Sequence, residues 1–416
     1  MTQAVMLAAG ASSRFWPLSE GRHKSLTQVM GKSLIQHTID NLKSMGIEDI
    51  IIVQGPGKEM EKVIKEPNVK FVVQKEPRGM GNAVSHARKF LKEQFFVLGA
   101  DHLDASIFLS PLLEKSKKTG ANVTLLGRET DTPWMYGILD IKKGMARGMI
   151  EKPDKGKEPS KVKVVSMYLL HPEFFDYLDK VPEKHYNYEE ALDLYMKKND
   201  VPVVVTEKDT LSLKYPWHVL NVSKKMLENM EPHIASTAKI DPSVKINGKV
   251  HIGENTRIFR NATINGPCYI GDNCIIGNNS LVRDYTILED DVMIGMGAEV
   301  TRSVFQKNVH VHSGFFGDSV IGENCRIGAG TITANVRIDR GIVKTHFKGK
   351  KVETGLKSLG VVIGNNTKTG IGVRFMPGVM VGSNCVIGPN TVVRKNIESD
   401  TLFYTEFKDV VKKRKT

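Results

Sequence analysis

The chain has 416 residues, of which 40% are hydrophobic and 25% are charged. This composition is typical of globular domains, and the length predicts two or three of them. The 59 Lys and Arg residues outnumber the 46 Asp and Glu residues, so the net charge of +13 favours an anionic partner. Four cysteines without a Cys-x-x-Cys pair exclude a disulfide framework and predict buried thiols. We find neither a signal-peptide core nor an apolar run of about 20 residues, and therefore expect a soluble, cytoplasmic protein.

The N-terminal part alternates short apolar runs with amphipathic stretches. The apolar runs predict buried strands, and the helical spacing of apolar residues between them predicts helices. Such an alternation is typical of a parallel sheet with helices on both faces. The strands are expected at residues 5–7, 50–53, 69–73, 95–98, 123–126, 136–141 and 162–170, and the helices at residues 34–45, 83–91, 189–198 and 219–230.

A six-residue repeat fills the C-terminal part. Aliphatic residues occupy every sixth position from Ile240 to Val300, and glycine follows four of them. This period is typical of a triangular β-helix, in which each step adds a short strand and a turn and three steps complete one coil. A β-sandwich is the alternative, but its strands would recur at about 8 to 12 residues with alternating polarity. We therefore expect an α/β protein, with a Rossmann-like, mainly parallel sheet over residues 1–230 and a left-handed parallel β-helix over residues 231–416.

A polar, basic insertion interrupts this repeat at about residues 336–357. The repeat holds at Ile321 and Ile327 and returns at Ile363. Charged side chains cannot line the apolar axis of a coil without a large desolvation cost. The insertion is therefore expected to leave the coil as a loop that carries Lys344, Lys348, Lys350 and Lys351.

A run of small residues from Leu7 to Arg14 follows the first predicted strand. Small residues let backbone N–H groups approach a phosphate, and Arg14 can add positive charge. The run lacks the Gly-x-Gly-x-x-Gly pattern of dinucleotide-binding proteins, and the Gly-Lys-Ser/Thr of a P-loop does not follow it. The run alone thus predicts a phosphate-binding loop of another type.

Further motifs follow in a fixed order: Lys24, Gly31 to Ile35, Gln74 to Gly79, Gly99 to Asp101, Tyr136-Gly137 and Glu151 to Pro153. In this order they resemble the sugar-1-phosphate nucleotidyltransferase family over most of residues 1–230. Together with the β-helix and the run Gly328 to Asn335, they resemble the archaeal type of the bifunctional N-acetylglucosamine-1-phosphate uridylyltransferase and glucosamine-1-phosphate acetyltransferase group.

The resemblance implies that a sugar phosphate oxygen attacks the α-phosphorus of UTP or dTTP and that pyrophosphate leaves. The sugar is expected to be N-acetylglucosamine-1-phosphate or glucose-1-phosphate. Such a reaction needs positioning and positive charge more than a covalent nucleophile. The resemblance assigns catalysis to Arg14 and Lys24, nucleotide binding to Leu7, Ala8, Ala9, Gly10, Gln74 and Gly79, and sugar-phosphate binding to Gly137, Glu151 and Lys152.

Asp101 is the expected Mg²⁺ ligand, because Mg²⁺ takes oxygen ligands and often only one or two carboxylates beside substrate phosphates. His218 stands where related sequences tend to have Asp, so we predict Asn221 as the second ligand. The sequence also departs from the family at His23, where Pro is usual. At residues 164–166 it has Val-Val-Ser, which removes an amide expected to contact the sugar. The residues expected to bind the sugar therefore depart from the family pattern more than those expected to bind the nucleotide.

Residues 309–322 resemble the acetyltransferase site of the same family, in which a His precedes the Asp of Gly-Asp by six residues. That position is His312, which the resemblance makes the general base for an amine attacking the thioester of acetyl-CoA. Phe315 and Arg326 replace a usual Tyr and Asn. These changes predict either a different acceptor or a loss of acetyl transfer.

Three functions remain open from the sequence. The first is a bifunctional enzyme, the second a nucleotidyltransferase whose β-helix serves assembly or regulation, and the third a non-catalytic regulatory subunit that binds a sugar nucleotide. The resemblance implies a homotrimer formed through the β-helix. No nucleic-acid module and no membrane partner is expected.

Overall fold

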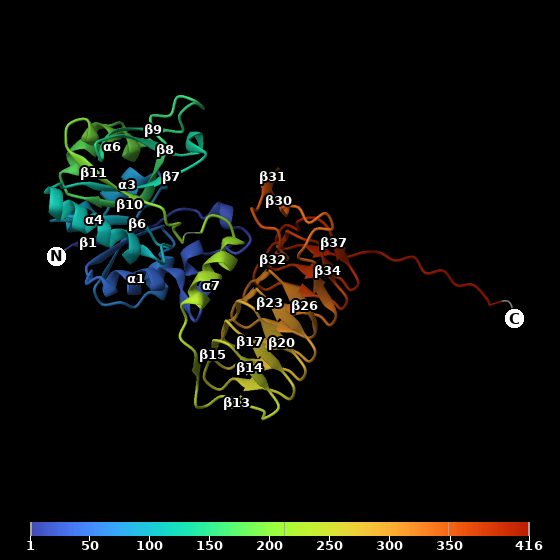
Figure 1. Ribbon diagram of the computed structural model, residues 1–416. Coiled ribbons are helices and arrows are strands. Elements are labelled where there is room, and N and C mark those ends of the chain that lie inside the picture. Colours follow the sequence, from blue (N-terminus) through green and yellow to red (C-terminus); the bar gives the residue numbers. More distant parts are fainter. Residues whose placement is uncertain (1, 212, 348, 415–416) are drawn as a thin grey trace. The chain divides into compact units, whose positions relative to one another are not determined.

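The computed structural model describes residues 2–211, 213–347 and 349–414 (Figure 1). Contacts divide the chain into two units, which are described separately. The first covers Met1–Ala11, Arg22–Thr27 and Ser33–Ser212, and the second covers Ser12–Gly21, Gln28–Lys32 and Leu213–Thr416. Helix α7 (His218–Glu228) thus groups with the second unit, although it precedes the expected boundary near residue 231.

The first unit is built on a nine-stranded sheet. The four strands β5, β4, β1 and β6 are neighbours in this order and are mutually parallel. Strand β10 runs antiparallel to both β6 and β7, and β11 lies parallel to β7. The seven strands expected from the sequence are all present, whereas β9 and β11 were not predicted. In sheet order the strands are β5 (Val69–Val73), β4 (Ile50–Gln54), β1 (Gln3–Ala8), β6 (Phe95–Gly99), β10 (Val162–Leu170), β7 (Thr124–Glu129), β11 (Val201–Thr206), β9 (Met145–Glu151) and β8 (Gly137–Lys142).

Helices pack on this sheet over two separate apolar cores. They are α1 (Leu34–Ser44), α2 (Glu59–Val63), α3 (Met80–Ser85), α4 (Ala105–Thr119), α5 (Phe174–Leu178) and α6 (Asn187–Met196), with 3₁₀ turns at Lys24–Leu26, Arg88–Phe90 and Pro133–Met135. The helix expected over residues 83–91 is wrong in extent, because α3 ends at Ser85 and a 3₁₀ turn follows. Helix α4 was not predicted; it contains Pro111, a residue that disfavours helix interiors.

The second unit is a parallel β-helix with three faces (Figure 1). Each face is one sheet of short strands, and successive coils stack along it. The first face contains β12 (His233–Ile234), β15 (Val250–Ile252), β18 (Cys268–Ile270), β21 (Thr286–Leu288), β24 (Val304–Phe305), β27 (Val320–Ile321), β32 (Val361–Ile363) and β35 (Val379–Val381).

The second face contains β13 (Lys239–Ile240), β16 (Arg257–Ile258), β19 (Ile275–Ile276), β22 (Met293–Ile294), β25 (His310–Val311), β28 (Arg326–Ile327), β33 (Lys368–Thr369), β36 (Val386–Ile387) and β38 (Leu402–Phe403). The third contains β14 (Lys245–Asn247), β17 (Thr263–Asn265), β20 (Leu281–Arg283), β23 (Glu299–Thr301), β26 (Gly314–Gly317), β29 (Thr331–Thr333), β34 (Arg374–Phe375) and β37 (Val392–Val393).

The six-residue repeat fills the axis of the β-helix, as the sequence predicts. Ile252 pairs with Ile270 and Ile258 with Ile276, so three steps of six residues make one coil. The repeated aliphatic residues from Ile252 to Val300 are at most 2% exposed, and all four cysteines are buried free thiols. Burial raises the pKa of the Cys268, Cys274, Cys325 and Cys385 thiols, which keeps them protonated.

Close stacking of the coils explains the glycines that follow the aliphatic residues. A Cβ atom on Gly295 would lie 1.9 Å from the carbonyl oxygen of His312 in the next coil, so no side chain fits there. Asparagine occupies left-handed positions at many of the corners, a conformation that Asn tolerates better than most residues.

The coil continues between residues 301 and 320, although aliphatic residues no longer occupy every sixth position there. Ile287 pairs with Val304 and Val300 with Phe316, so one coil is shorter by one or two residues. The basic insertion leaves the coil as predicted. Val320 pairs with Val362, and the intervening chain contains the hairpin of β30 (Lys344–Phe347) and β31 (Lys350–Glu353). Lys348 lies outside the described residues.

Two N-terminal segments also belong to the second unit. The first includes a 3₁₀ turn, Ser13–Phe15, and the Glu20 carboxylate at its end accepts hydrogen bonds from Ser383 N at 2.9 Å and from the Ser399 hydroxyl. The second segment, Gln28–Lys32, contains β2 (Gln28–Val29), which pairs with β3 (Lys32–Ser33).

The buried Glu289 side chain fixes the second of these segments. Its carboxylate oxygens accept hydrogen bonds from the backbone N–H groups of Met30 (2.7 Å) and Gly31 (2.8 Å). Complete burial raises the pKa of Glu289 to about 8, although the two N–H groups oppose this shift.

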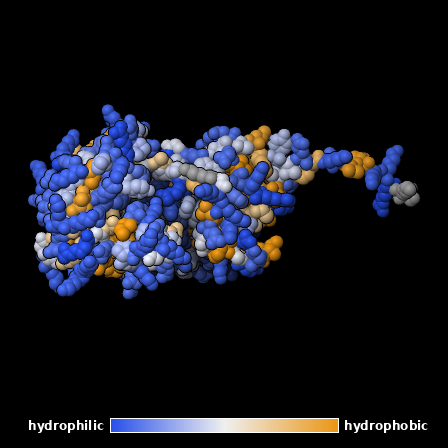
Figure 2. All heavy atoms as spheres, turned by 90° about the horizontal axis from the view of Figure 1, so that it is seen from above, coloured by the Kyte–Doolittle hydropathy of each residue, from blue (hydrophilic) through white to orange (hydrophobic). Residues whose placement is uncertain are grey.

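Hydrophilic residues cover most of the face drawn in Figure 2, and hydrophobic residues form small separate patches. Within the described residues, no helix is both long enough and apolar enough to cross a membrane.

We predict that Glu289 makes stability depend on pH. A carboxyl group whose pKa is raised on folding contributes stability that is fully present below its unfolded pKa near 4.5. This contribution is lost as pH rises towards the folded pKa near 8. The free energy of unfolding should therefore fall by up to about 5 kcal/mol over this window. Thermal unfolding at a series of pH values should show a flatter profile for Glu289→Gln than for the wild type.

The exposed Glu254 on the same β-helix supplies the matched control, and Glu254→Gln should keep the wild-type profile. Equal pH profiles for Glu289→Gln and the wild type would contradict the role of this carboxyl.

Candidate functional site

The loop after β1 leaves the sheet at the carboxyl edge of its parallel half. β1 and β6 are parallel neighbours, and the Ala100 N–H donates to the Leu7 carbonyl at 3.2 Å. The structure therefore brings the expected nucleotide loop, Leu7, Ala8, Ala9 and Gly10, to the edge at which Asp101 lies. Arg14 is exposed in the 3₁₀ turn that groups with the second unit, and its role stays a prediction.

Lys24 and Asp101, predicted separately, are in direct contact. Lys24 Nζ lies 2.7 Å from Asp101 Oδ2, and Asp101 is only 5% exposed. A charge-assisted hydrogen bond of this length compensates a carboxylate that is largely removed from water. The first unit thus holds a cation and an anion together at the edge where the phosphates are expected.

Asp101 suits a Mg²⁺ ion that is held mainly by substrate oxygens. It offers one carboxylate, which is the kind and number of protein ligand that Mg²⁺ often uses beside phosphates. No group of three or more His, Cys, Asp or Glu residues that could hold a metal is found among the described residues. Asn221 is exposed on α7 in the second unit, so its role as a second ligand stays a prediction.

His23, which stands before Lys24, is buried and acts as a helix cap. The Nδ1 atom of His23 accepts a hydrogen bond from Ser25 N at 3.2 Å, and the backbone N–H of His23 donates to the Glu59 carboxylate. Burial, together with the positive charge of Lys24, lowers the pKa of His23 to about 4. A neutral imidazole therefore starts the 3₁₀ turn that carries Lys24.

Gln74 and Gly79 are brought together, as the nucleotide-binding prediction requires. The Gln74 Nε2 atom donates to the Gly79 carbonyl at 3.3 Å and to Asn82 Oδ1 at 2.7 Å, and Gln74 is 4% exposed. These bonds fix the orientation of the Gln74 amide. Asn82 was not predicted, although it lies eight residues after Gln74 on the next helix.

The expected sugar-phosphate residues meet where β8 begins and β9 ends. Gly137 pairs with Glu151, and a Cβ atom on Gly137 would lie 2.8 Å from Glu151 Oε2. Lys152 has a left-handed backbone, its Nζ atom lies 3.7 Å from Glu151 Oε1, and it faces the ring of Tyr186. The structure therefore brings Gly137, Glu151 and Lys152 together.

The first turn of α6 places polar side chains that were not predicted next to this group. Tyr188 Oη and Glu189 Oε2 are buried and have no hydrogen-bond partner among the described residues. Near Asp101, the buried His102 and Asp104 were also missed. The sequence signal that could have found Glu189 is an acidic residue beside the buried face of a predicted helix.

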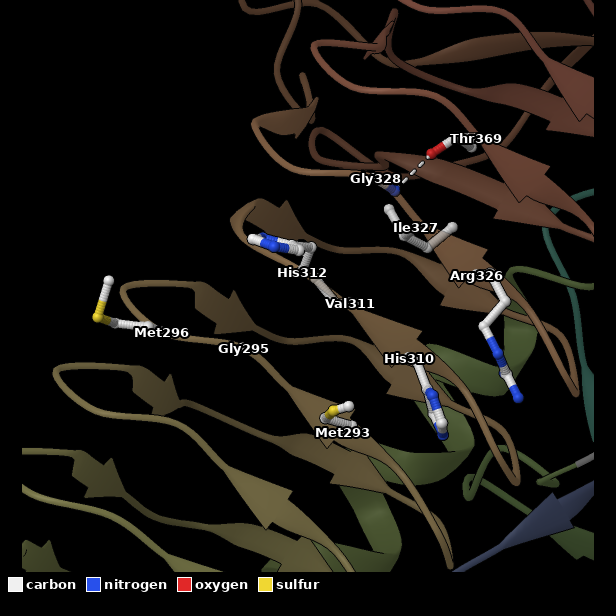
Figure 3. Close-up of a pocket in the computed structure, with 10 residues that line it drawn as sticks. All are labelled: Met293, Gly295, Met296, His310, Val311, His312, Arg326, Ile327, Gly328 and Thr369. Carbon is white, nitrogen blue, oxygen red and sulfur yellow. Dashed lines mark hydrogen bonds between the residues drawn. The ribbon is translucent and has the colours of Figure 1, made fainter.

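His312 lines a pocket of about 490 Å³ on the second face of the β-helix (Figure 3). The pocket spans several coils, because Met293, His310 and Arg326 occupy equivalent positions in successive strands. It is lined by Met293, Gly295, Met296, His310, Val311, His312, Arg326, Ile327, Gly328 and Thr369.

Two histidines face this pocket from different positions. His312 is exposed on the turn after β25, and its N–H donates to the Ile327 carbonyl at 2.9 Å. His310 lies on the strand itself and points to the same side as Arg326 in Figure 3. Burial, with the charge of Arg326, lowers the pKa of His310. The guanidinium of Arg326 donates to the Asn308 carbonyl at 2.6 Å, which orients it away from His312.

The comparisons with known families match both units. Residues 3–218 match the nucleotidyl transferase family, and residues 249–284, 267–302 and 360–395 match the bacterial transferase hexapeptide family with its six repeats.

Full-length relatives are found among archaea. The bifunctional protein GlmU of Methanocaldococcus jannaschii is 34% identical and covers 96% of this chain and 97% of its own length. The bifunctional sugar-1-phosphate nucleotidylyltransferase/acetyltransferase of Sulfurisphaera tokodaii is 34% identical and covers 95% and 98%. A solved structure of UTP-bound UGPase from Acinetobacter baumannii covers 55% of this chain and 94% of its own, with a TM-score of 0.49 and 22% identity.

We predict that His23 makes the first unit sensitive to acid. A His whose pKa is lowered on folding contributes stability above its unfolded value near 6.5, and this contribution is lost as pH falls towards about 4. In His23→Asn, the side chain can still cap the turn but does not titrate. The loss of thermal stability between pH 7 and pH 5 should therefore be smaller in His23→Asn than in the wild type. An equal loss would show that His23 ionises normally.

Proposed function

Because the chain belongs to the family of bifunctional sugar-1-phosphate nucleotidylyltransferases/acetyltransferases, we propose that it transfers a nucleotidyl group from UTP or dTTP to a sugar-1-phosphate and acetylates an amino-sugar phosphate. The Lys24–Asp101 contact beside the nucleotide loop is the observation that carries the first activity. N-acetylglucosamine-1-phosphate and glucose-1-phosphate are the first sugars to test.

Nucleotidyl transfer follows from charge and position. A phosphate oxygen of the sugar substrate attacks the α-phosphorus, the bond to the β-phosphate oxygen breaks, and pyrophosphate leaves. Lys24 neutralises charge that develops on the α-phosphate, and Arg14 neutralises the leaving pyrophosphate. Gln74 and the backbone near Gly79 bind the pyrimidine, while Glu151 and Lys152 bind the sugar phosphate.

Mg²⁺ bound at Asp101 would supply positive charge to the nucleotide phosphates and orient them. The Lys24 ammonium already lies beside this carboxylate, so the Mg²⁺ ion and Lys24 would both contact Asp101. Asn221 is the proposed second ligand.

Acetyl transfer is proposed for the β-helix pocket. Attack on the thioester of acetyl-CoA requires a neutral amine, and His312 would accept the proton that the amine loses as the new amide forms and the thiolate of CoA leaves. We place this protein in the cytoplasm as a homotrimer assembled through its β-helix.

A β-helix without acetyl transfer is the second candidate. Phe315 and Arg326 replace two polar residues expected near the acceptor, and Arg326 would repel an ammonium. In that case the β-helix serves assembly or regulation.

Nucleotidyl transfer should depend on Lys24. We expect Lys24→Met to lower kcat by about 10²- to 10³-fold, the usual effect of removing a group that stabilises transition-state charge. Pyrophosphate release is measured with Mg²⁺, UTP or dTTP and a panel of hexose-1-phosphates. Lys62→Met, which removes an exposed ammonium on α2, is the control and should retain full activity. No turnover of any pair by the wild type would refute nucleotidyl transfer, and normal turnover by Lys24→Met would refute the role of Lys24.

Acetyl transfer should depend on His312. Release of free thiol from acetyl-CoA in the presence of glucosamine-1-phosphate is expected to fall about 10²-fold or more in His312→Ala, because no base remains to accept the amine proton. His310→Ala changes the same pocket and should retain most of the activity. Loss of activity in His310→Ala but not in His312→Ala would identify His310, and not His312, as the general base. No thiol release by the wild type would favour the assembly role of the β-helix.

A further inference from the structure

A chain of hydrogen bonds in the first unit leads from Gln74 to the protein surface. The Gln74 side chain is buried, and its Nε2 atom donates to Asn82 Oδ1 at 2.7 Å. Asn82 lies on α3, and its Nδ2 atom donates in turn to Glu183 Oε1 at 2.7 Å. Glu183 is exposed in the loop before α6. Three residues from separate parts of the sequence thus form one line of bonds.

The carboxylate at the end gives this line a direction. An ionised carboxylate has no hydrogen to donate, so only the Nδ2 end of the Asn82 amide can bond to Glu183. The Oδ1 end of Asn82 is then left for Gln74, which has to meet it with its own Nε2 atom. Arg78 binds the second carboxylate oxygen of Glu183, with Nη1 at 3.2 Å from Oε2, and so helps to hold the group in position.

The turn at Gly79 sets the same orientation independently. Gln74 Nε2 also donates to the Gly79 carbonyl at 3.3 Å. Gly79 has a left-handed φ of 99°, and a Cβ atom on it would lie 2.5 Å from the His185 carbonyl. The turn therefore packs closely against the loop that carries Glu183. If the Gln74 amide were reversed, its oxygen would face two other oxygens.

These two bonds use both hydrogens of the Gln74 amide. A side-chain amide has two donor hydrogens on its nitrogen and an acceptor oxygen. Gly79 and Asn82 take the hydrogens, so the Oε1 atom is the part of this amide that remains for a ligand. Among the described residues, no donor to Gln74 Oε1 is found. Gln74 is therefore set to accept a hydrogen bond from a bound base.

An acceptor at this position separates the pyrimidine bases. Uracil and thymine carry a hydrogen on N3, whereas the N3 atom of cytosine has no hydrogen and is itself an acceptor. Gln74 Oε1 would bond to the first two bases and would face a lone pair in the third. A site built to hydrogen-bond its ligand rejects an analogue that cannot form the bond far more strongly than an apolar pocket does.

We propose that Asn82 and Glu183 are positioning residues of the nucleotide site: they hold the Gln74 amide with its oxygen free for the base, and the enzyme therefore selects UTP or dTTP over CTP. This inference rests on the proposed nucleotidyl transfer and on the binding of the base at Gln74. Neither positioning residue needs to touch the base. Glu183 acts through Asn82, and Asn82 acts through Gln74.

The experiment measures base selectivity in the full-length protein. Steady-state pyrophosphate release is followed with Mg²⁺, a hexose-1-phosphate that the wild type uses, and UTP, dTTP or CTP in turn. The wild type should show a kcat/KM for UTP or dTTP about 100-fold or more above that for CTP. Asn82→Ala removes one acceptor for Nε2 and lets the Gln74 amide turn. It should lower this ratio about 10-fold, the effect of one hydrogen bond.

The loss should appear in KM rather than in kcat. A contact to the base is the same in the ground state and in the transition state. Its loss in Asn82→Ala should therefore raise the KM for UTP, while kcat and the KM of the sugar phosphate stay near their wild-type values. A variant that is only less well folded contains less active enzyme, which lowers the rates with all three nucleotides alike and leaves the ratio unchanged.

A double-mutant cycle tests whether Glu183 acts through Asn82. Glu183→Ala alone should lower the ratio by about 3-fold, because its bond to Asn82 is exposed to water. Added to Asn82→Ala, the same substitution should change the ratio no further. Glu190→Ala is the matched control, since it removes a nearby carboxylate that pairs with Lys184 at 2.6 Å, and it should leave the ratio unchanged.

The outcomes separate this inference from the proposed function. A wild type that uses CTP as well as UTP and dTTP, or an Asn82→Ala variant with an unchanged ratio, overturns the positioning role while nucleotidyl transfer stands. Additive effects of the two substitutions overturn the action of Glu183 through Asn82. If Asn82→Ala does not fold, an unchanged ratio in Glu183→Ala overturns the proposal. No turnover of any nucleotide by the wild type overturns nucleotidyl transfer itself.

Discussion

The stacking of coils at the spacing of one parallel sheet is the constraint on which the second unit depends. Each coil must place one aliphatic side chain per face on the axis, and each such burial contributes about 1.5–3 kcal/mol. Backbone groups of successive coils approach so closely at Gly295 that a methyl group has no room. Any segment that violates this spacing has to leave the coil, as the hairpin of β30 and β31 does. A pocket on one face therefore collects side chains from several coils at fixed intervals.

Paired charges organise the first unit in a similar way. Lys24 and Asp101 lie 77 positions apart in the sequence, and the parallel pairing of β1 with β6 brings their neighbourhoods to one edge. The cation stabilises a carboxylate that is almost removed from water, and the neutral His23 beside it avoids a second buried positive charge. The ion pair thus offsets part of the cost of removing the Asp101 carboxylate from water.

Much of this architecture could be read from the sequence, since it follows local rules. The repeat from Ile240 to Val300 determines the β-helix because a period of six residues has one regular solution. The register was lost after Val300, where coils shorten by one or two residues and a strict count fails. Helix α4 was not predicted, and it contains Pro111, a residue that disfavours helix interiors. Ordered motifs predicted Lys24, Asp101, Gln74 and Glu151 as site residues. The structure places Lys24 beside Asp101, and the roles of all four stay predictions. It does not test the role of Asn221.

Several of the residues that were missed are notable only because they are buried, which a sequence does not display. Glu189 reads as an ordinary charged residue of an amphipathic helix, and its neighbour Glu190 does pair with a lysine at the surface. One helical step of about 100° separates the two side chains, and this rotation puts one carboxylate oxygen out of contact with water. The oxygen of Glu189 that has no partner among the described residues could be found only once the structure had placed this turn of α6 against the sheet.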